Sequence, residues 1–182
     1  MTYPTPNPGG RNKQLIRDTV KEWIDAQSIQ GLAELWPDWA PSLPYEWAPE
    51  AGNASHACIA AVWVPRTSET RVTTNGPTDR GGIELRSTVE LHVYHRTFSP
   101  DEWREAQNDY DRIIDAIKDC LRGRGRDLGR PDVIFLAAES PGGQPNIEDV
   151  QEEPVDADGM LDLWGTVYFE VMAYLPSTYP SA

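Results

Sequence analysis

The sequence predicts an α+β fold in which two main helices pack on an antiparallel or mixed sheet of about four to five strands. Two long segments alternate apolar and polar residues, as strands with one buried face do. Two other segments carry apolar residues at helical spacing. The length of 182 residues, with 39% hydrophobic and 25% charged residues, fits one folded domain.

We expect the domain to span residues 11–176. Residues 1–10 contain three prolines and two glycines and predict an extended N-terminal arm, and residues 177–182 form a short tail. Residues 11–27 predict the first helix, because their apolar side chains share one stripe at helical spacing. The stripe consists of Leu15, Ile16, Val20, Trp23 and Ile24.

Residues 32–54 form a Pro-rich insertion whose four prolines exclude a regular element longer than a few residues. The insertion nevertheless contains Trp36, Trp39, Tyr45 and Trp47, which is more aromatic surface than a solvated loop usually carries. Two interpretations stay open for these side chains. They pack across the domain, or they contact another subunit, since aromatic residues are favoured in interfaces.

The first strands are expected after this insertion. Residues 56–64 are apolar on both faces and predict a short buried strand, with residues 70–74 as its partner. Residues 83–95 alternate most regularly, with polar or amphipathic residues between the apolar side chains of Ile83, Leu85, Val89, Leu91 and Val93. This pattern predicts a long antiparallel strand with one face in the core.

The second helix has a well-defined predicted start. Ser99 fits the N-cap position, Pro100 the first helical position, and Glu102 completes a capping box. An apolar stripe then continues to Leu121, and Gly123 is a natural C-terminal stop.

Two further strands complete the predicted fold. Residues 133–138 predict a short buried strand, and residues 160–175 predict a second long alternating one. Three tryptophans fall on stripes or strands of the predicted core, and we expect them to be buried there. They are Trp23, Trp63 and Trp103.

Charge is distributed unevenly along the chain. The net charge of −13 argues against tight binding of nucleic acid or of an anionic membrane, since both need clustered Lys and Arg. From residue 131 onward there is no Lys or Arg, and residues 139–159 hold seven of the ten acids found there, which predicts a long acidic loop. Four arginines precede that loop, and their guanidinium groups are suited to pair with carboxylates of a neighbouring subunit. They are Arg122, Arg124, Arg126 and Arg130.

The sequence indicates no catalytic, cofactor-binding or metal site, and we do not expect an enzyme. Cys58 and Cys120 are too few for a disulfide framework and are expected to be buried, reduced thiols. His92 and His95 lie three residues apart on a predicted strand, so they face opposite sides and do not chelate one metal ion. The glycines of residues 123–129 follow a helix and lack the GK[ST] ending of a phosphate loop.

Two weaker signals point the same way. The residues Asp156-Ala-Asp158-Gly159 lack the later ligands of a calcium loop, although a loosely held divalent cation on the acidic loop stays open. No apolar run approaches about 18 residues, and the N-terminus lacks the pattern of a signal peptide. We therefore expect that the protein does not associate with a membrane. We also expect that it is synthesised in a reducing cytoplasm.

Seven segments follow one another along the chain in a distinctive order. They are RNKQLIRDTVKEWIDAQ, GLAELWPDWAP, HACIAAVWV, RGGIELRSTVELHVYHRT, SPDEWREAQNDYDRIIDAIKDCLR, VIFLAAES and LWGTVYFEVMAYL. In order and length they resemble the tail terminator proteins of long-tailed bacteriophages over residues 11–176. The insertion at 32–54 and the acidic loop at 139–159 depart from a compact member of that family.

The resemblance implies a structural virion protein, made in the host cytoplasm. Such proteins form a ring, usually a hexamer, that caps the tail tube and ends its polymerisation. The ring then meets the head-completion proteins of the neck, and genomic DNA passes through its bore without tight binding. The expected partners are therefore other copies of the chain, the tail tube protein and a neck protein, with no membrane and no cofactor.

On this hypothesis two groups of residues receive roles. The subunit or partner interface is expected at Trp36, Trp39, Trp47, Arg122, Arg124, Arg126 and Arg130. The bore is expected to be lined by carboxylates, which repel DNA phosphates. The bore candidates are Glu84, Glu90, Glu148, Asp149, Glu152 and Glu153.

Other functions stay open at this point. The chain is also compatible with another neck, head–tail connector or minor tail protein. A different class is a small-ligand-binding α+β domain or enzyme with a site under the Trp-rich insertion, although a catalytic constellation is missing. A third is an acidic partner-binding module, such as a nucleic-acid mimic.

Overall fold

The computed structural model describes residues 11–37, 56–72, 82–97, 100–122, 128, 134–136, 146–157 and 160–176. In chain order the elements are α1 (Arg11–Asp25), β1 (Leu32–Trp36), β2 (His56–Val72), β3 (Gly82–Thr97), the 3₁₀ turn η1 (Pro100–Glu102), α2 (Trp103–Arg122), β4 (Ile134–Leu136), β5 (Ile147–Gln151), β6 (Val155–Ala157) and β7 (Met160–Pro176). This is an α+β fold, as the sequence predicts.

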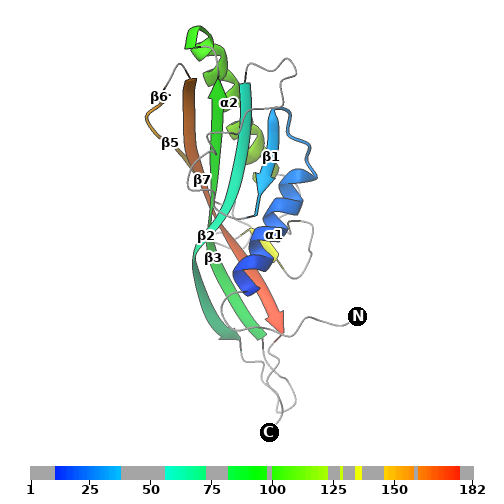
Figure 1. The fold of residues 1–182 in the computed structure, drawn as a ribbon. Helices are drawn as coiled ribbons and strands as arrows, with labels where there is room; N and C mark the ends of the chain where they lie inside the picture. Colours follow the sequence, from blue (N-terminus) through cyan, green and yellow to red (C-terminus); the bar gives the residue numbers. More distant parts are fainter. Residues whose placement is uncertain are drawn as a thin grey trace, which may run out of the picture.

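The described strands form one mixed sheet of seven strands, in the order β1-β2-β3-β7-β4, with β5 and β6 also paired to β7. Its centre is an antiparallel ribbon of the three long strands β2, β3 and β7, which run along the length of the described fold (Figure 1). Strand β1 pairs in parallel with the first residues of β2. The short strands β4, β5 and β6 pair one after another along the outer edge of β7.

The alternation of the long strands is confirmed by their burial. Odd-numbered residues of β3 from Leu85 to Thr97 are buried, and the even-numbered ones are half-buried or exposed except for Arg96. The register carries this pattern across the ribbon, because Leu91 of β3 lies opposite Val62 of β2 and Val167 of β7. One face of the sheet is therefore the core face over the whole width of the ribbon.

Both helices cover this core face. Helix α1 contributes Ile16, Val20 and Ile24 to the buried cluster, as its predicted stripe requires. Helix α2 contributes a longer stripe to the same cluster, consisting of Ala106, Tyr110, Ile113, Ile114, Ile117 and Leu121. The sheet is thus packed by helices on one side, which leaves the opposite face without a helical layer among the described residues.

Strand β2 is longer than predicted, because residues 56–64 and the expected partner strand join into one element. A register shift between Trp63 and Arg66 marks a bulge at Pro65, a residue that lacks an N–H for the sheet ladder. The ammonium of Lys13 donates a hydrogen bond to the Pro65 carbonyl oxygen at 3.0 Å. The first turn of α1 is thereby connected to the bulge.

Two predicted irregular segments contain strands. Residues 32–36 of the Pro-rich insertion form β1, ahead of Pro37, and Leu35 is buried in the core. In the predicted acidic loop, residues 147–151 and 155–157 form β5 and β6. The reason is that β7 has 17 residues and β3 satisfies only one of its edges, so the other edge needs hydrogen-bond partners.

The prediction that Trp103 is buried in the core is wrong. The side chain of Trp103 is 54% exposed, because it stands at the first position of α2, before the buried stripe begins at Ala106. Trp23 is partly buried against the core, as expected. Trp63 is half-buried but lies on the sheet face opposite the helices, since its register partner is Glu90.

At Gly165 of β7, a side chain of α2 and the backbone of β5 approach the strand closely. A Cβ atom there would collide with the Tyr110 hydroxyl oxygen and the Val150 carbonyl oxygen, and would lie 3.0 Å from the Cα of Gln151.

We predict that Gly165→Ala lowers the free energy of unfolding by about 1–3 kcal/mol through overpacking, measured by urea unfolding. The control, Glu170→Gln on the exposed face of β7, should change it by less than about 0.5 kcal/mol. Equal stability of Gly165→Ala and the wild type would contradict this packing.

Candidate interaction surfaces

The sheet face opposite the helices carries a row of aromatic side chains, which we call the aromatic face. It consists of Trp36, Trp63, Tyr94, Trp164 and Tyr168, all half-buried. The strand register places these side chains in cross-strand rows. In one row Tyr94 of β3 lies opposite Trp164 of β7. The other row runs across four strands, and its members are Trp63, Glu90, Tyr168 and Glu148. Aromatic residues of this kind, half-buried on a sheet face, are typical of surfaces that contact other proteins.

An ion pair fixes β3 to β7 at the edge of the aromatic face. The Arg96 guanidinium donates to both carboxylate oxygens of Asp162, at 2.6 and 2.8 Å. The Arg96 side chain is only 7% exposed, so this bidentate contact lies in a partly desolvated environment. Its geometry holds the strand end on which Leu161 and Leu163 stand.

His92 lies among polar neighbours on the same face. Its Nδ1 is 3.1 Å from the Thr166 hydroxyl, and its Nε2 is 3.3 Å from the Glu90 carboxylate. Burial lowers the pKa of His92 below its ordinary value of 6.5, and the nearby Glu90 carboxylate opposes this shift in part. The imidazole is therefore easier to protonate in the unfolded chain than in the folded one.

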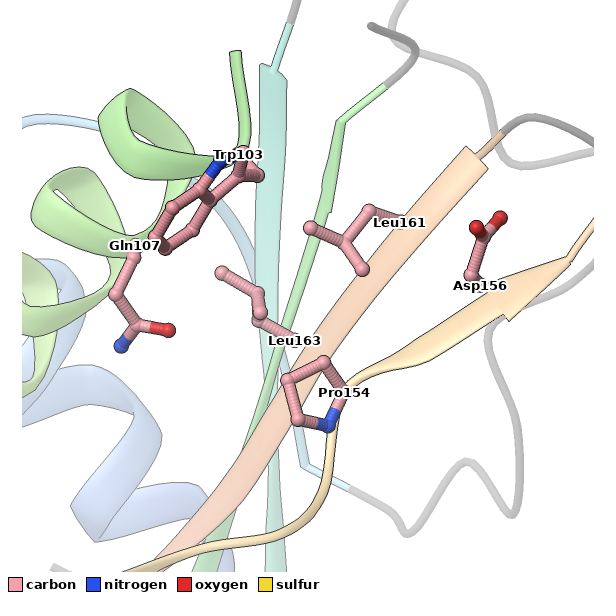
Figure 2. Close-up of a pocket in the computed structure, with 6 residues that line it drawn as sticks. All are labelled: Trp103, Gln107, Pro154, Asp156, Leu161 and Leu163. Carbon is pink, nitrogen blue, oxygen red and sulfur yellow. The ribbon is translucent and has the colours of Figure 1, made fainter. Parts of the chain in front are cut away.

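A second surface lies on the helix side, at the end of the sheet where β7 begins. We call it the Trp103 groove; its lining is Trp103, Gln107, Pro154, Asp156, Leu161 and Leu163, and its volume is about 330 Å³. Figure 2 shows the two leucines of β7 between the indole of α2 and the residues of the β6 segment. The groove is an apolar surface with one carboxylate.

Strand β5, beside this groove, is connected to α2 by polar side chains. The amides of Gln107 and Gln151 each donate to the other, at 3.1 and 3.0 Å. About three turns further along α2, the Lys118 ammonium donates to the Asp149 carboxylate at 2.5 Å. These contacts position the segment that follows β5, including Pro154 and Asp156.

The predicted bore carboxylates fall into three places. Glu84, Glu90 and Glu148 lie on the aromatic face, where Glu84 accepts a hydrogen bond from the Tyr174 hydroxyl at 3.1 Å. Asp149 points to the helix side instead, and Lys118 compensates its charge. The remaining two, Glu152 and Glu153, are exposed between β5 and β6.

The predicted interface residues are only partly described. Trp36 is half-buried on the aromatic face, and its indole N–H donates to the Glu34 carboxylate at 2.7 Å. Arg122 is exposed at the end of α2, with a guanidinium nitrogen 3.9 Å from Asp119. The others lie outside the described residues, so their roles stay predictions: Trp39, Trp47, Arg124, Arg126 and Arg130.

The described residues bring together no group of three or more His, Cys, Asp or Glu side chains that would hold a metal ion. Both thiols are free; Cys58 is buried and Cys120 half-buried, and burial raises the pKa of each, assisted by Asp109 and Asp119 respectively. A raised pKa makes a thiol a poor nucleophile at neutral pH. None of the described helices is long and apolar enough to cross a membrane.

Sequence reasoning missed the Trp103 groove, because it assigned Trp103 to the core. The signal that could have shown this is the position of Trp103 directly after the capping sequence. An apolar residue at the first position of a helix is buried only where the neighbouring strand extends far enough to cover it. Leu161 and Leu163 lie two residues apart on the helix side of the last strand, as the predicted alternation over residues 160–175 requires.

No protein-family model and no curated protein sequence matches this chain.

We predict that His92 makes stability depend on pH on the acid side of neutrality. Because the folded chain binds this proton less readily, the free energy of unfolding should fall as the pH drops below about 6.5, by at most about 1.4 kcal/mol per pH unit. His92→Gln should remove this contribution, measured by urea unfolding between pH 7.5 and about 5. The control Ser68→Ala, on the exposed part of β2, should keep the wild-type pH dependence. An unchanged profile in His92→Gln would contradict the prediction.

Proposed function

We propose that this chain is the subunit of a hexameric ring that caps the tail tube of a long-tailed bacteriophage and joins it to the head-completion proteins. The proposal combines the resemblance of the sequence with one structural observation. The helices cover only one face of the sheet, and the opposite face carries five half-buried aromatic side chains. A chain with a net charge of −13 that keeps such a surface is suited to bind other protein surfaces.

Exposed apolar residues support association at the β7 end of the sheet. Trp103 is 54% exposed, and Val150 and Val155 on the edge strands are 48% and 49% exposed. Val150 and Val155 lie beside the aromatic face, since their register partners are Thr166 and Asp162. The aromatic face and the Trp103 groove thus lie on opposite faces of the sheet, near the edge formed by β5 and β6. A subunit of a ring has neighbours on two sides, and two such surfaces suit that arrangement.

The acids of the aromatic face suit a bore through which DNA passes. Glu90 and Glu148 stand in one cross-strand row, separated by Tyr168. Carboxylates that repeat around a ring repel phosphates and prevent DNA from adhering to the wall. We propose that this row, which includes Trp63 and Tyr168, faces the bore, and that Trp36, Tyr94 and Trp164 make the protein contacts of the same face. The tail tube protein and a neck protein would then lie on the two rims of the ring.

One observation favours a second candidate, a small-ligand-binding domain. The Trp103 groove has a volume of about 330 Å³, at the lower end of the range for ligand pockets. Its lining offers one ionisable group, Asp156, and it is bounded by an exposed tryptophan and an exposed turn. Such a groove orients a small polar substrate poorly. Its shape therefore favours binding of another protein surface over binding of a small ligand.

The ring proposal makes a direct prediction about mass. The purified chain of 20.4 kDa should form particles of about six subunits by light scattering, with a central pore in negative stain. The same chain should be found in purified virions, at the junction of tail and neck. A dilution series serves as the control for non-specific aggregation, which would give no fixed size. A chain that stays monomeric at high concentration, or that is absent from virions, would contradict the function.

The bore assignment is tested by charge reversal. Glu90→Lys with Glu148→Lys should make rings retain double-stranded DNA in a mobility-shift assay at low salt, whereas wild-type rings should not. The matched control reverses two exposed helix acids, Asp25 and Asp115, to Lys and changes the net charge equally. If the control retains DNA as strongly as the test variant, the row does not face the bore.

A further inference from the structure

We propose that β5 receives an added strand from another protein, an extended basic segment that pairs with the outer edge of the sheet. On the aromatic face this segment places Lys or Arg opposite Glu148 and Glu152, and an apolar residue opposite Val150. The contact is separate from those that close the proposed ring, so it holds for the chain in any oligomeric state. Glu148 also ends the row proposed to face the bore, and a bound partner neutralises that carboxylate while Glu90 keeps its charge.

Strand β5 lies at the outer edge of β7 (Figure 1). Among the described residues it pairs with β7 alone, through residues 147–151. The register continues one step further, because the Glu152 N–H donates to the Trp164 carbonyl oxygen at 3.0 Å. Hydrogen-bonded and non-hydrogen-bonded pairs alternate in an antiparallel ladder, so every second residue of β5, counted back from Glu152, bonds to β7. The residues between them direct their N–H and C=O groups outward; they are Ile147, Asp149 and Gln151.

The outward groups make β5 a template for an added strand, because each of these residues offers one hydrogen-bond donor and one acceptor. Their side chains already hold β5 in place from the helix side. Lys118 donates to Asp149, Gln107 bonds to Gln151, and Ile147 packs against the core. The edge is therefore ordered before a partner arrives, which lowers the entropic cost of binding.

The side chains that β5 turns to the aromatic face define the chemistry of the partner. They are Glu148, Val150 and Glu152. Val150 is 48% exposed, and both carboxylates are exposed as well. Glu148 accepts a hydrogen bond from the Asn146 amide at 3.0 Å, but neither carboxylate has a basic partner among the described residues. Cross-strand neighbours of opposite charge stabilise a strand pair, so residues that alternate basic, apolar and basic complement this row.

Like charges disfavour the edges of identical chains as partners. The other edge of the sheet is β1, whose Glu34 lies on the aromatic face. In each antiparallel register that substantially overlaps β1 with β5, Glu34 stands directly or diagonally across from Glu148 or Glu152. Acids that discourage pairing between copies leave the edge to a basic strand, which is a common way to combine protection and specificity.

The chain also lacks an available segment of the required pattern. Basic, apolar and basic residues at alternate positions occur at residues 13–17 and 118–122, which belong to α1 and α2. A third example is residues 126–130, whose central Leu128 is buried in the core. The added strand therefore comes from a protein of different sequence.

Synthetic peptides test the contact on the full chain. The probe is a fluorescein-labelled peptide with the core Lys-Thr-Val-Thr-Lys, and its binding is measured by fluorescence anisotropy at low salt. Antiparallel pairing places its valine opposite Val150 and its threonines opposite Asp149 and Gln151. Methylation of both threonine nitrogens removes the donors to β5 and should weaken binding at least about tenfold. Methylation of the valine nitrogen, which points away from β5, should change the affinity less than about twofold.

Variants of the chain test the charges. Glu148→Gln with Glu152→Gln keeps the shape of the edge and should weaken binding of the probe about three- to tenfold at low salt. The matched control, Asp25→Asn with Asp115→Asn, changes the net charge equally on two exposed helix positions and should bind the probe as the wild type does. A peptide with Glu in place of both lysines should not bind.

The outcomes separate this contact from the proposed ring. Binding that depends on the threonine N–H groups and on the two carboxylates, but not on the valine nitrogen, would establish the added strand. Equal binding of all three peptides, or no binding of the probe, would overturn it, whatever mass the chain has by light scattering. If the N–H groups of Asp149 and Gln151 are protected from hydrogen exchange without peptide, the edge pairs with another copy, and the contact is likewise overturned. A wild type that binds the probe but forms no ring would overturn the proposed function alone.

Discussion

The register of β3 is the constraint on which the rest of the structure depends. This strand is hydrogen-bonded on both edges over almost its whole length, so its odd-numbered residues determine which side chains of β2 and β7 face the helices. A slip by one residue would turn Leu91 to the aromatic face and drive the Glu90 carboxylate into the core. Burying that charge without a partner costs several kcal/mol, which keeps the alternation in one register.

The helices take up only one of the two faces that this register creates. Helix α1 covers the β1–β2 side and α2 the β3–β7 side of the same face, and both contribute to one core. The opposite face therefore has to be stabilised by its own side chains, such as the buried Ile59 and the Arg96–Asp162 pair. Among the described residues, a sheet packed in this way leaves one extended face uncovered by helices.

Compensation of charge is as uneven in space as it is along the chain. Asp149 and Asp162 are neutralised by basic side chains that reach across from α2 and β3. The acids between β5 and β6 have no such partner among the described residues, and Arg122, the last residue of α2, has only a 3.9 Å contact to Asp119.

The sequence by itself determined the fold class, the two helices and the faces of the long strands, because these follow from periodicities of two and about 3.6 residues that are local properties of the chain. It did not determine β1, β5 and β6, whose residues alternate weakly and pair only because a long neighbouring strand leaves an edge to be satisfied. Nor did it place Trp103, since a residue at the end of a helical stripe is buried or exposed according to how far the strands beneath it extend. Only the tertiary structure decided which acids stand together and which are neutralised, because their partners come from elements distant in the chain.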